Sequence, residues 1–280
     1  EEFISGVILF DETIRQSTLN DSVPFPEYLT NLNVVPGIKV DKGAHPLSGS
    51  DGEKVTEGLD GLNDRLKEYY QLGARFAKWR AVITIGESEP SSACVSANAH
   101  ALARYAALCQ ENDIVPIVEP EILMDGTHTI EESFVLTEEV LHTVFYELHG
   151  QGVLYEGMVL KPNMILSGYK SSEQAIVEDV AEMTVTALKR SVPAAVPGIA
   201  FLSGGQSDED ATAHLNAMNQ ILGENSPWNL TYSFGRALQA PALKAWDGEA
   251  GNVSIAQEAF YKRAKLNSLA TKGGYSPDME

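Results

Sequence analysis

Residues 114–119, IVPIVE, are an apolar, β-branched run that ends in a carboxylate, and a second carboxylate, Glu121, follows two positions later. Six further apolar runs occur along the chain, most of them rich in Val, Ile and Phe and bounded by Gly, Pro or polar residues. Short runs with such boundaries are typical of strands that are buried on both faces of a parallel sheet. They lie at residues 6–10, 34–40, 74–82, 157–161, 198–203 and 228–234.

Amphipathic stretches separate these runs, with apolar residues three and four positions apart as in a helix. Three Ser/Thr-x-x-Glu/Gln pairs predict helix starts, because such capping boxes satisfy free N–H groups. They are Thr129 with Glu132, Ser171 with Gln174, and Ser254 with Gln257. The alternation of strands and helices predicts an α/β fold, either a doubly wound sheet or a TIM (β/α)8 barrel.

The glycine pattern favours the barrel. A doubly wound nucleotide fold should carry G-x-G-x-x-G or G-x-x-x-x-G-K-[ST] at an early strand–helix turn, and neither occurs. The nearest match, at residues 150–155, has Tyr155 where the third glycine belongs. Seven of the eight barrel strands are visible, and no linker or repeat divides the chain. We therefore expect a single barrel domain over residues 1–280.

Charge and cysteine content exclude several classes of protein. The chain has 20 Lys+Arg and 39 Asp+Glu, a net charge of −19, which disfavours nucleic acid and anionic membranes as partners. No apolar run approaches the roughly 20 residues of a membrane helix. Two cysteines do not make a disulfide framework, which favours a reducing compartment. The six histidines lack zinc-site spacing, so we expect no metal.

Charged residues interrupt four consecutive apolar runs. A barrel gathers the C-terminal ends of its strands at one mouth, so these side chains should meet there, cations beside carboxylates. One such lysine is more often an ion-paired strand end, but four runs with the same feature indicate a functional site. The residues are Lys39, Lys78, Arg80, Glu119, Glu121 and Lys161.

Two glycine-containing turns follow the last two runs. Ser203-Gly204-Gly205 and Gly235-Arg236 each lead from a predicted strand into a predicted helix. Glycine lets the backbone approach an anion, and helix N-termini direct N–H groups toward it. Arg236 adds a planar fork suited to phosphate, and loops after the last two strands are the usual phosphate site of a barrel. A plain tight turn is the alternative for Gly204-Gly205.

Lysines beside a phosphate site suggest imine chemistry on a phosphorylated carbonyl compound. A lysine attacks a carbonyl only as the neutral amine, which nearby positive charge or desolvation favours. Lys78 and Arg80 would supply that charge near Lys161, and Glu119 would shuttle protons during dehydration. The protonated imine then accepts electrons from the adjacent C–C bond as it breaks.

Five ordered motifs carry a family resemblance: FAKWR (76–80), VEPEIL (118–123), LKPNM (160–164), FLSGGQS (201–207) and GRALQ (235–239). Together they resemble class I fructose-bisphosphate aldolase. The resemblance runs from GVILF (6–10) and VPGIKVDKG (35–43) to AKLNSLA (264–270). It implies a (β/α)8 barrel, commonly a homotetramer, that needs no metal or cofactor. The implied reaction is reversible cleavage of fructose bisphosphate to dihydroxyacetone phosphate and glyceraldehyde 3-phosphate, in the cytoplasm or in a plastid.

The resemblance also implies residue roles. Lys161 is the imine-forming lysine, Glu119 transfers protons, Lys78 assists carbinolamine formation and dehydration, and Glu121 is a carboxylate neighbour of the imine lysine. The implied ligands of one phosphate are Ser203, Gly204, Gly205, Ser233, Gly235 and Arg236. Lys39, Lys78 and Arg80 would line the rest of the substrate path.

Two departures from the family pattern accompany the resemblance. Family members have an earlier strand, with an aspartate that assists cleavage, and a tail that ends in tyrosine. We therefore expect the sequence to be an N-terminally incomplete piece of a longer protein. Two alternatives stay open at this point: a non-catalytic scaffold that keeps the sugar-phosphate pocket, and another imine-forming aldolase such as a transaldolase or deoxyribose-phosphate aldolase.

Overall fold

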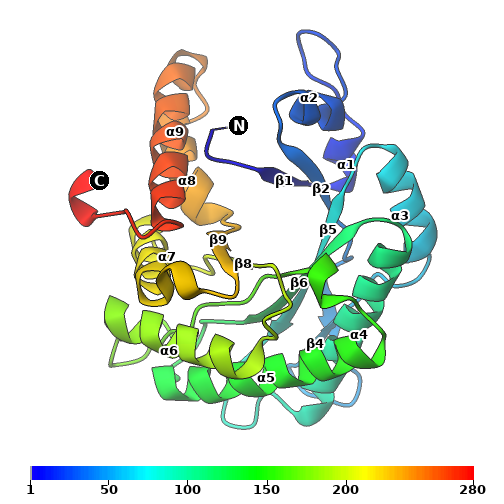
Figure 1. Cartoon of the computed structure of the whole chain (residues 1–280), viewed down its shortest axis with the longest axis vertical. Helices are drawn as coiled ribbons and strands as arrows, with labels where there is room; N and C mark the ends of the chain where they lie inside the picture. The colour runs from blue at the N-terminus through cyan, green and yellow to red at the C-terminus, as the bar shows by residue number, and fades with distance from the viewer. Residues whose placement is uncertain (1) are drawn as a thin grey trace.

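The computed structural model describes residues 2–280, which form one curled parallel sheet with helices around it (Figure 1). The sheet has seven strands in the order β1-β2-β5-β6-β7-β8-β9, with every neighbouring pair parallel. Their bounds are β1 (Gly6–Leu9), β2 (Val35–Lys39), β5 (Phe76–Ile83), β6 (Val115–Ile122), β7 (Val159–Leu160), β8 (Gly198–Phe201) and β9 (Asn229–Tyr232). All seven predicted strands are thus confirmed, and within residues 2–280 β1 and β9 form the two edges of this sheet.

Helices follow the strands and lie along the outer side of the curl (Figure 1). The α-helices are α1 (Asp11–Ile14), α2 (Phe25–Asn31), α3 (Leu62–Gln71), α4 (Ser92–Glu111), α5 (Ile130–Gly150), α6 (Val177–Ser191), α7 (Asp208–Leu222), α8 (Arg236–Trp246) and α9 (Val253–Ala270). Short 3-10 helices are η1 (Tyr155–Gly157), η2 (Gly223–Asn225), η3 (Ala250–Asn252) and η4 (Pro277–Met279). Across residues 2–280, none of the helices is long and apolar enough to cross a bilayer.

The predicted helix starts have mixed outcomes. Thr129 forms a complete capping box with Glu132 at the start of α5, as predicted. Ser171 does not cap a helix, because the Gln174 side chain donates to the carbonyls of Gly168 and Ser171 in a turn and α6 begins only at residue 177. The prediction that Ser254 caps a helix is also wrong, because α9 begins one residue earlier, at Val253.

A two-stranded antiparallel hairpin, β3 (Ala44–Pro46) with β4 (Lys54–Thr56), was not predicted. Each strand has only three residues, and all three residues of β3 are exposed, so the hairpin lacks an apolar run that would reveal it. Its β4 strand has a role near the site, because the Thr56 hydroxyl donates to the Arg80 carbonyl at 2.8 Å.

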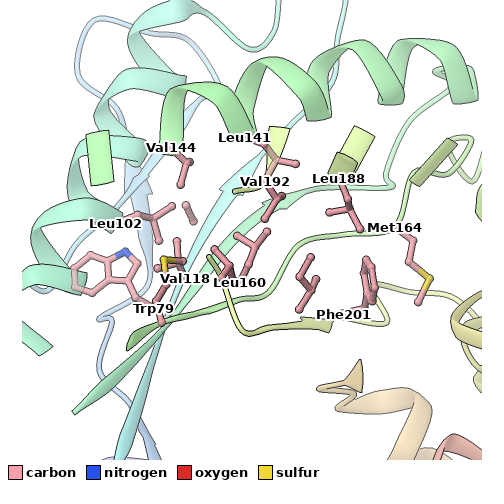
Figure 2. Packing of buried hydrophobic residues seen from close by; sticks show 14 of the residues in the cluster. Trp79, Leu102, Val118, Leu141, Val144, Leu160, Met164, Leu188, Val192 and Phe201 are labelled. Carbon is pink, nitrogen blue, oxygen red and sulfur yellow. The ribbon is translucent and has the colours of Figure 1, made fainter. Parts of the chain in front are cut away.

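The core lies between the outer face of the sheet and the helices (Figure 2). Trp79 on β5 is fully buried and stacks on Tyr105 of α4, with 5.6 Å between ring centroids. The Tyr105 hydroxyl donates to the Ala77 carbonyl at 2.7 Å and ties the helix to the strand. Side chains alternate along a strand, so burying Ala77 and Trp79 on this face turns Lys78 and Arg80 to the inside of the curl.

Candidate active site

Strand register brings the charged side chains of four neighbouring strands together on the inside of the curl. Lys39 pairs with Lys78 in the register of β2 and β5, and Arg80 pairs with Glu119 in that of β5 and β6. The backbone N–H of Lys161, just after β7, donates to the Val118 carbonyl at 2.8 Å and continues the hydrogen-bond ladder between β6 and β7. These residues therefore occupy adjacent positions at the C-terminal ends of the strands, where barrel enzymes carry their active sites.

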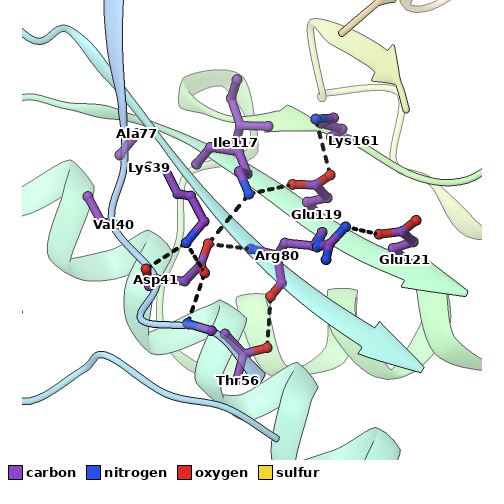
Figure 3. Close-up of polar contacts among 12 residues, drawn as sticks. Lys39, Val40, Asp41, Thr56, Ala77, Arg80, Ile117, Glu119, Glu121 and Lys161 are labelled. Carbon is purple, nitrogen blue, oxygen red and sulfur yellow. Dashed lines mark hydrogen bonds and ion pairs between the residues drawn. The ribbon is translucent and has the colours of Figure 1, made fainter. Parts of the chain in front are cut away.

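Three lysines and two carboxylates form one continuous row of ion pairs (Figure 3). Glu119 lies at its centre, with Oε1 at 3.1 Å from Lys161 Nζ and Oε2 at 3.1 Å from Lys78 Nζ. Lys78 Nζ also lies 3.4 Å from Asp41 Oδ2, and Lys39 Nζ lies 2.6 Å from Asp41 Oδ1. Three lysines thus alternate with two carboxylates, and the row is electrically neutral when one lysine gives up its proton.

Lys161 is the lysine best placed to be that neutral amine. Burial lowers its pKa, and the Lys78 charge lowers it further, while Glu119 opposes the shift without cancelling it. A buried ammonium is disfavoured because it loses its hydration. The amine is therefore more available to attack a carbonyl than an exposed lysine would be.

Arg80 does not act on Lys161 as expected from the sequence. Its guanidinium instead donates to Glu121 Oε2 at 2.9 Å, and its side chain remains about half exposed. Burial raises the pKa of Glu121 above its usual value, although the Arg80 charge opposes this. The pair forms a second, separate contact at the mouth, so Lys78 is the cation that influences Lys161.

The two glycine-containing turns lie side by side because β8 and β9 pair from Gly198 to Phe201. The Arg236 guanidinium, at the first position of α8, donates to the Gly204 carbonyl at 2.6 Å. Ser203 is buried beneath the turn, and the Ser233 N–H donates to the Phe201 carbonyl at 2.8 Å at the end of β9. Arg236, a helix N-terminus and a glycine turn thus surround one patch, which is a suitable arrangement for a phosphate.

Close packing explains one glycine of this turn. A Cβ on Gly205 would lie 2.1 Å from the Tyr169 hydroxyl oxygen, far inside van der Waals contact. The backbone of the turn can therefore reach its position only without a side chain. The contact with Tyr169 therefore fixes the position of the Gly204-Gly205 turn.

Sequence reasoning missed two elements of the site. Asp41 joins Lys39 to Lys78, and its spacing of two from Lys39 in an extended run was the signal that both face the same side. Gln206 supports the glycine turn by donating to the Ser203 carbonyl at 3.0 Å, while its Oε1 lies 2.6 Å from His214 Nδ1. Burial lowers the pKa of His214 to about 4, so the ring is neutral, and no sequence pattern marks this pair.

Comparison with known proteins decides the family. The profile described as "Glycolytic: Fructose-bisphosphate aldolase class-I" matches residues 1–280. The chain belongs to the class I fructose-bisphosphate aldolases. As an aldolase of this class it is a lyase that cleaves fructose bisphosphate through a lysine Schiff base, as the motifs predicted. The doubly wound sheet, the non-catalytic scaffold and the other imine-forming aldolases are therefore discarded.

Curated relatives of the aldolase cover nearly all of it. A "Probable fructose-bisphosphate aldolase class 1" from Xanthomonas axonopodis pv. citri is 59% identical over 97% of this chain and 81% of its own length. "Fructose-bisphosphate aldolase 4, cytosolic" from Arabidopsis thaliana is 54% identical over 100% of this chain and 70% of its own length.

The solved structures confirm the barrel class of the fold. A fructose-bisphosphate aldolase from Plasmodium falciparum, solved in complex with TRAP and a small-molecule inhibitor, superimposes with a TM-score of 0.95. It is 50% identical and covers 98% of this chain and 79% of its own. The curled seven-stranded sheet of this aldolase is thus the TIM-like barrel architecture of the family.

Proposed function

We propose that Lys161 is the imine-forming lysine of this aldolase, with Glu119 as its proton-transfer partner and Lys78 as the cation that supports both. The observation that carries this proposal is the buried Lys161–Glu119–Lys78 row, with both nitrogen–oxygen distances at 3.1 Å. Burial that lowers the pKa of Lys161 supports its role as the nucleophile.

The row suits each step of the reaction. The Lys161 ammonium first passes a proton to Glu119, 3.1 Å away, and becomes the neutral amine. The amine attacks the C2 carbonyl of fructose bisphosphate, and a proton moves from nitrogen to oxygen to give a carbinolamine. Glu119 delivers one further proton to the hydroxyl group, which leaves as water, and a protonated imine remains. The Lys78 ammonium, 3.1 Å away, stabilises the carboxylate that results.

Cleavage follows from the imine. The electron pair of the C3–C4 bond moves into the imine as the Glu119 carboxylate takes the proton of the C4 hydroxyl group, which releases glyceraldehyde 3-phosphate and leaves an enamine. Protonation of the enamine carbon and hydrolysis of the imine release dihydroxyacetone phosphate and restore the Lys161 amine. Because the protonated imine is the electron sink, the proposed mechanism uses no metal.

The remaining site residues are proposed to bind the substrate. One phosphate group is assigned to Ser203, Gly204, Gly205, Ser233, Gly235 and Arg236. Lys39 and Arg80 are assigned to the rest of the substrate path, since both lie at the mouth with partly exposed side chains. Glu121 keeps Arg80 in place through their 2.9 Å contact.

The assembly of the protein is also a proposal. We infer that residues 1–280 act as a single barrel domain, since consecutive strands share one sheet. The homotetramer follows from the family resemblance. A cytoplasmic location is supported by relatives named cytosolic in Arabidopsis thaliana and cytoplasmic in Pisum sativum.

Cleavage by lysine variants tests the proposal. Lys161→Met keeps the length of the side chain but removes the amine, and it should abolish measurable cleavage of fructose bisphosphate. Lys189→Met, at an exposed lysine in the last turn of α6, should retain wild-type activity. A Lys161→Met protein that folds and still cleaves the substrate would overturn the assignment.

A further inference from the structure

Asp41 is the one carboxylate in the row that none of the roles above uses. It lies two residues beyond β2, and its side chain is only 3% exposed. Oδ1 accepts hydrogen bonds from Lys39 Nζ at 2.6 Å and from the Gly43 N–H at 3.2 Å. Oδ2 accepts hydrogen bonds from Lys78 Nζ at 3.4 Å and from the backbone N–H of Arg80 at 3.3 Å. Asp41 therefore contacts two lysines and the backbone of two separate segments.

The carboxylate is ionised despite its burial. Burial alone would raise the pKa of Asp41, but the charge of Lys78 and the hydrogen bond from Lys39 outweigh it and leave the pKa below its usual value. A buried charge without partners is costly, and two lysines and two backbone N–H groups supply the partners of Asp41. Removal of the Asp41 charge would therefore leave Glu119 as the one carboxylate in the row for three lysines.

Arg65 of α3 fixes the backbone next to Asp41. The Arg65 guanidinium donates to the Val40 carbonyl at 2.9 Å and to the Gly58 carbonyl at 2.5 Å. Lys39 Nζ also donates to the Asp41 carbonyl at 2.9 Å. The carboxylate is thus a fixed anchor, whereas the lysine side chains that it contacts have rotatable stems.

Lys39 makes the shorter contact with Asp41, at 2.6 Å, but Lys78 is the lysine that connects Asp41 to Glu119. Its ammonium lies between two carboxylates, 3.4 Å from Asp41 and 3.1 Å from Glu119. Without the first carboxylate, the ammonium would be drawn toward Glu119 alone, and Glu119 would be drawn away from Lys161. A displacement of about 1 Å in a catalytic group can cost roughly 100-fold in rate.

We propose that Asp41 is a positioning residue that holds the Lys78 ammonium in place, so that Glu119 stays aligned with Lys161. This inference rests on the proposed roles of Lys78 and Lys161. Asp41 itself makes no contact with Lys161 in the row, so its effect on the reaction passes through Lys78.

Asp41→Asn tests the inference, because it keeps the shape of the side chain and removes its charge. We expect kcat for fructose bisphosphate cleavage to fall by about 10- to 100-fold, with KM changed by less than about threefold. The rate of borohydride trapping with dihydroxyacetone phosphate should fall in parallel. Glu53→Gln is the matched control, because Glu53 is equally buried and its carboxylate accepts hydrogen bonds from the backbone N–H and the hydroxyl of Ser91, outside the row. It should leave both rates unchanged.

A double-mutant cycle separates positioning from a general structural effect. In a Lys78→Met background, Asp41→Asn should cost less than about threefold in further trapping rate, because its partner is already gone. A full additional loss in that background, or an unchanged rate in the single variant, would overturn the inference. If Asp41→Asn does not fold, Asp41→Glu is the second variant: it displaces the charge by one methylene and should lower kcat, and a wild-type kcat would refute the inference.

The proposed function fails in a different way. If Lys78→Met alone retains wild-type trapping, or if Lys161→Met is trapped, then the assigned roles are wrong regardless of Asp41. If both variants behave as expected while the Asp41→Asn effect adds in full to that of Lys78→Met, only the positioning role is wrong.

Discussion

Arg236→Ala is expected to weaken phosphate binding while leaving the fold and the imine chemistry intact. Hydrogen bonds to charged groups contribute about 1.5–3 kcal/mol, and each 1.36 kcal/mol is tenfold. The predicted loss in kcat/KM for fructose bisphosphate is therefore about 12- to 160-fold. The Arg236 side chain is exposed, and it donates one hydrogen bond to the Gly204 carbonyl. The free energy of unfolding should therefore change by only about 0.5–1.5 kcal/mol.

Substrates with and without phosphate isolate the role of this arginine. Borohydride trapping with dihydroxyacetone phosphate should weaken in Arg236→Ala, whereas trapping with unphosphorylated dihydroxyacetone should not change. Arg236→Lys keeps the charge without the planar fork and should give an intermediate loss. Arg190→Ala is the matched control, because Arg190 is an exposed arginine on α6 that pairs with Glu138.

The opposite pattern would refute the reasoning. If Arg236→Ala slowed trapping of both compounds equally, the arginine would serve to shape the Gly204 turn rather than to bind phosphate. If it left kcat/KM unchanged, the phosphate assignment would have to be abandoned.

Further predictions concern stability, pH and metal dependence. Gly37→Ala should destabilise the fold by about 1–3 kcal/mol in chemical denaturation, because the new Cβ would lie 2.2 Å from the Phe76 ring; adding Phe76→Leu should recover part of the loss, and no recovery would contradict the clash. Lys78→Met should move the low-pH limb of imine trapping to higher pH, because removing a nearby positive charge raises the pKa of Lys161 and keeps it protonated longer; a shift to lower pH would contradict this. Cleavage should be unaffected by EDTA, and activity that disappears and returns with zinc would show that the imine is not the electron sink.

The positions of the strands could be predicted because their signal is local. Strands buried on both faces read as apolar runs, and Gly, Pro or polar residues mark their ends. Strand β7 shows the limit of this signal: residues 157–161 were predicted, but the strand is only Val159–Leu160, and the backbone N–H of Lys161 is the last donor to β6. Pro162 directly after Lys161 has no N–H to extend the ladder.

The helix caps were less predictable because their chemistry is not specific to helices. A Ser-x-x-Gln pair can close a turn as well as a helix, and residues 171–174 do so. Thr129 stands directly before the first residue of α5, whereas Ser254 already lies inside the first turn of α9. A Ser/Thr-x-x-Glu/Gln pair therefore predicts a helix start only where residues with helical periodicity follow it.

The charged site residues could be predicted singly but not their partners. A charge within a buried strand is visible in the sequence, and all six such residues lie at the mouth as expected. Their pairing depends on strand register and side-chain direction, which the sequence does not specify. Arg80 therefore turned out to face Glu121 rather than Lys161, and Asp41 was overlooked although it lies two residues from Lys39.

The central claim, that Lys161 forms the imine, is tested most directly by reductive trapping and peptide mapping. Wild-type protein is incubated with dihydroxyacetone phosphate, reduced with borohydride and digested, and the modified peptide is identified by mass spectrometry. The structure predicts a single adduct on Lys161, because that amine is buried, has a lowered pKa and lies 3.1 Å from Glu119. An adduct on Lys78 or Lys39 instead, or no adduct at all, would contradict it.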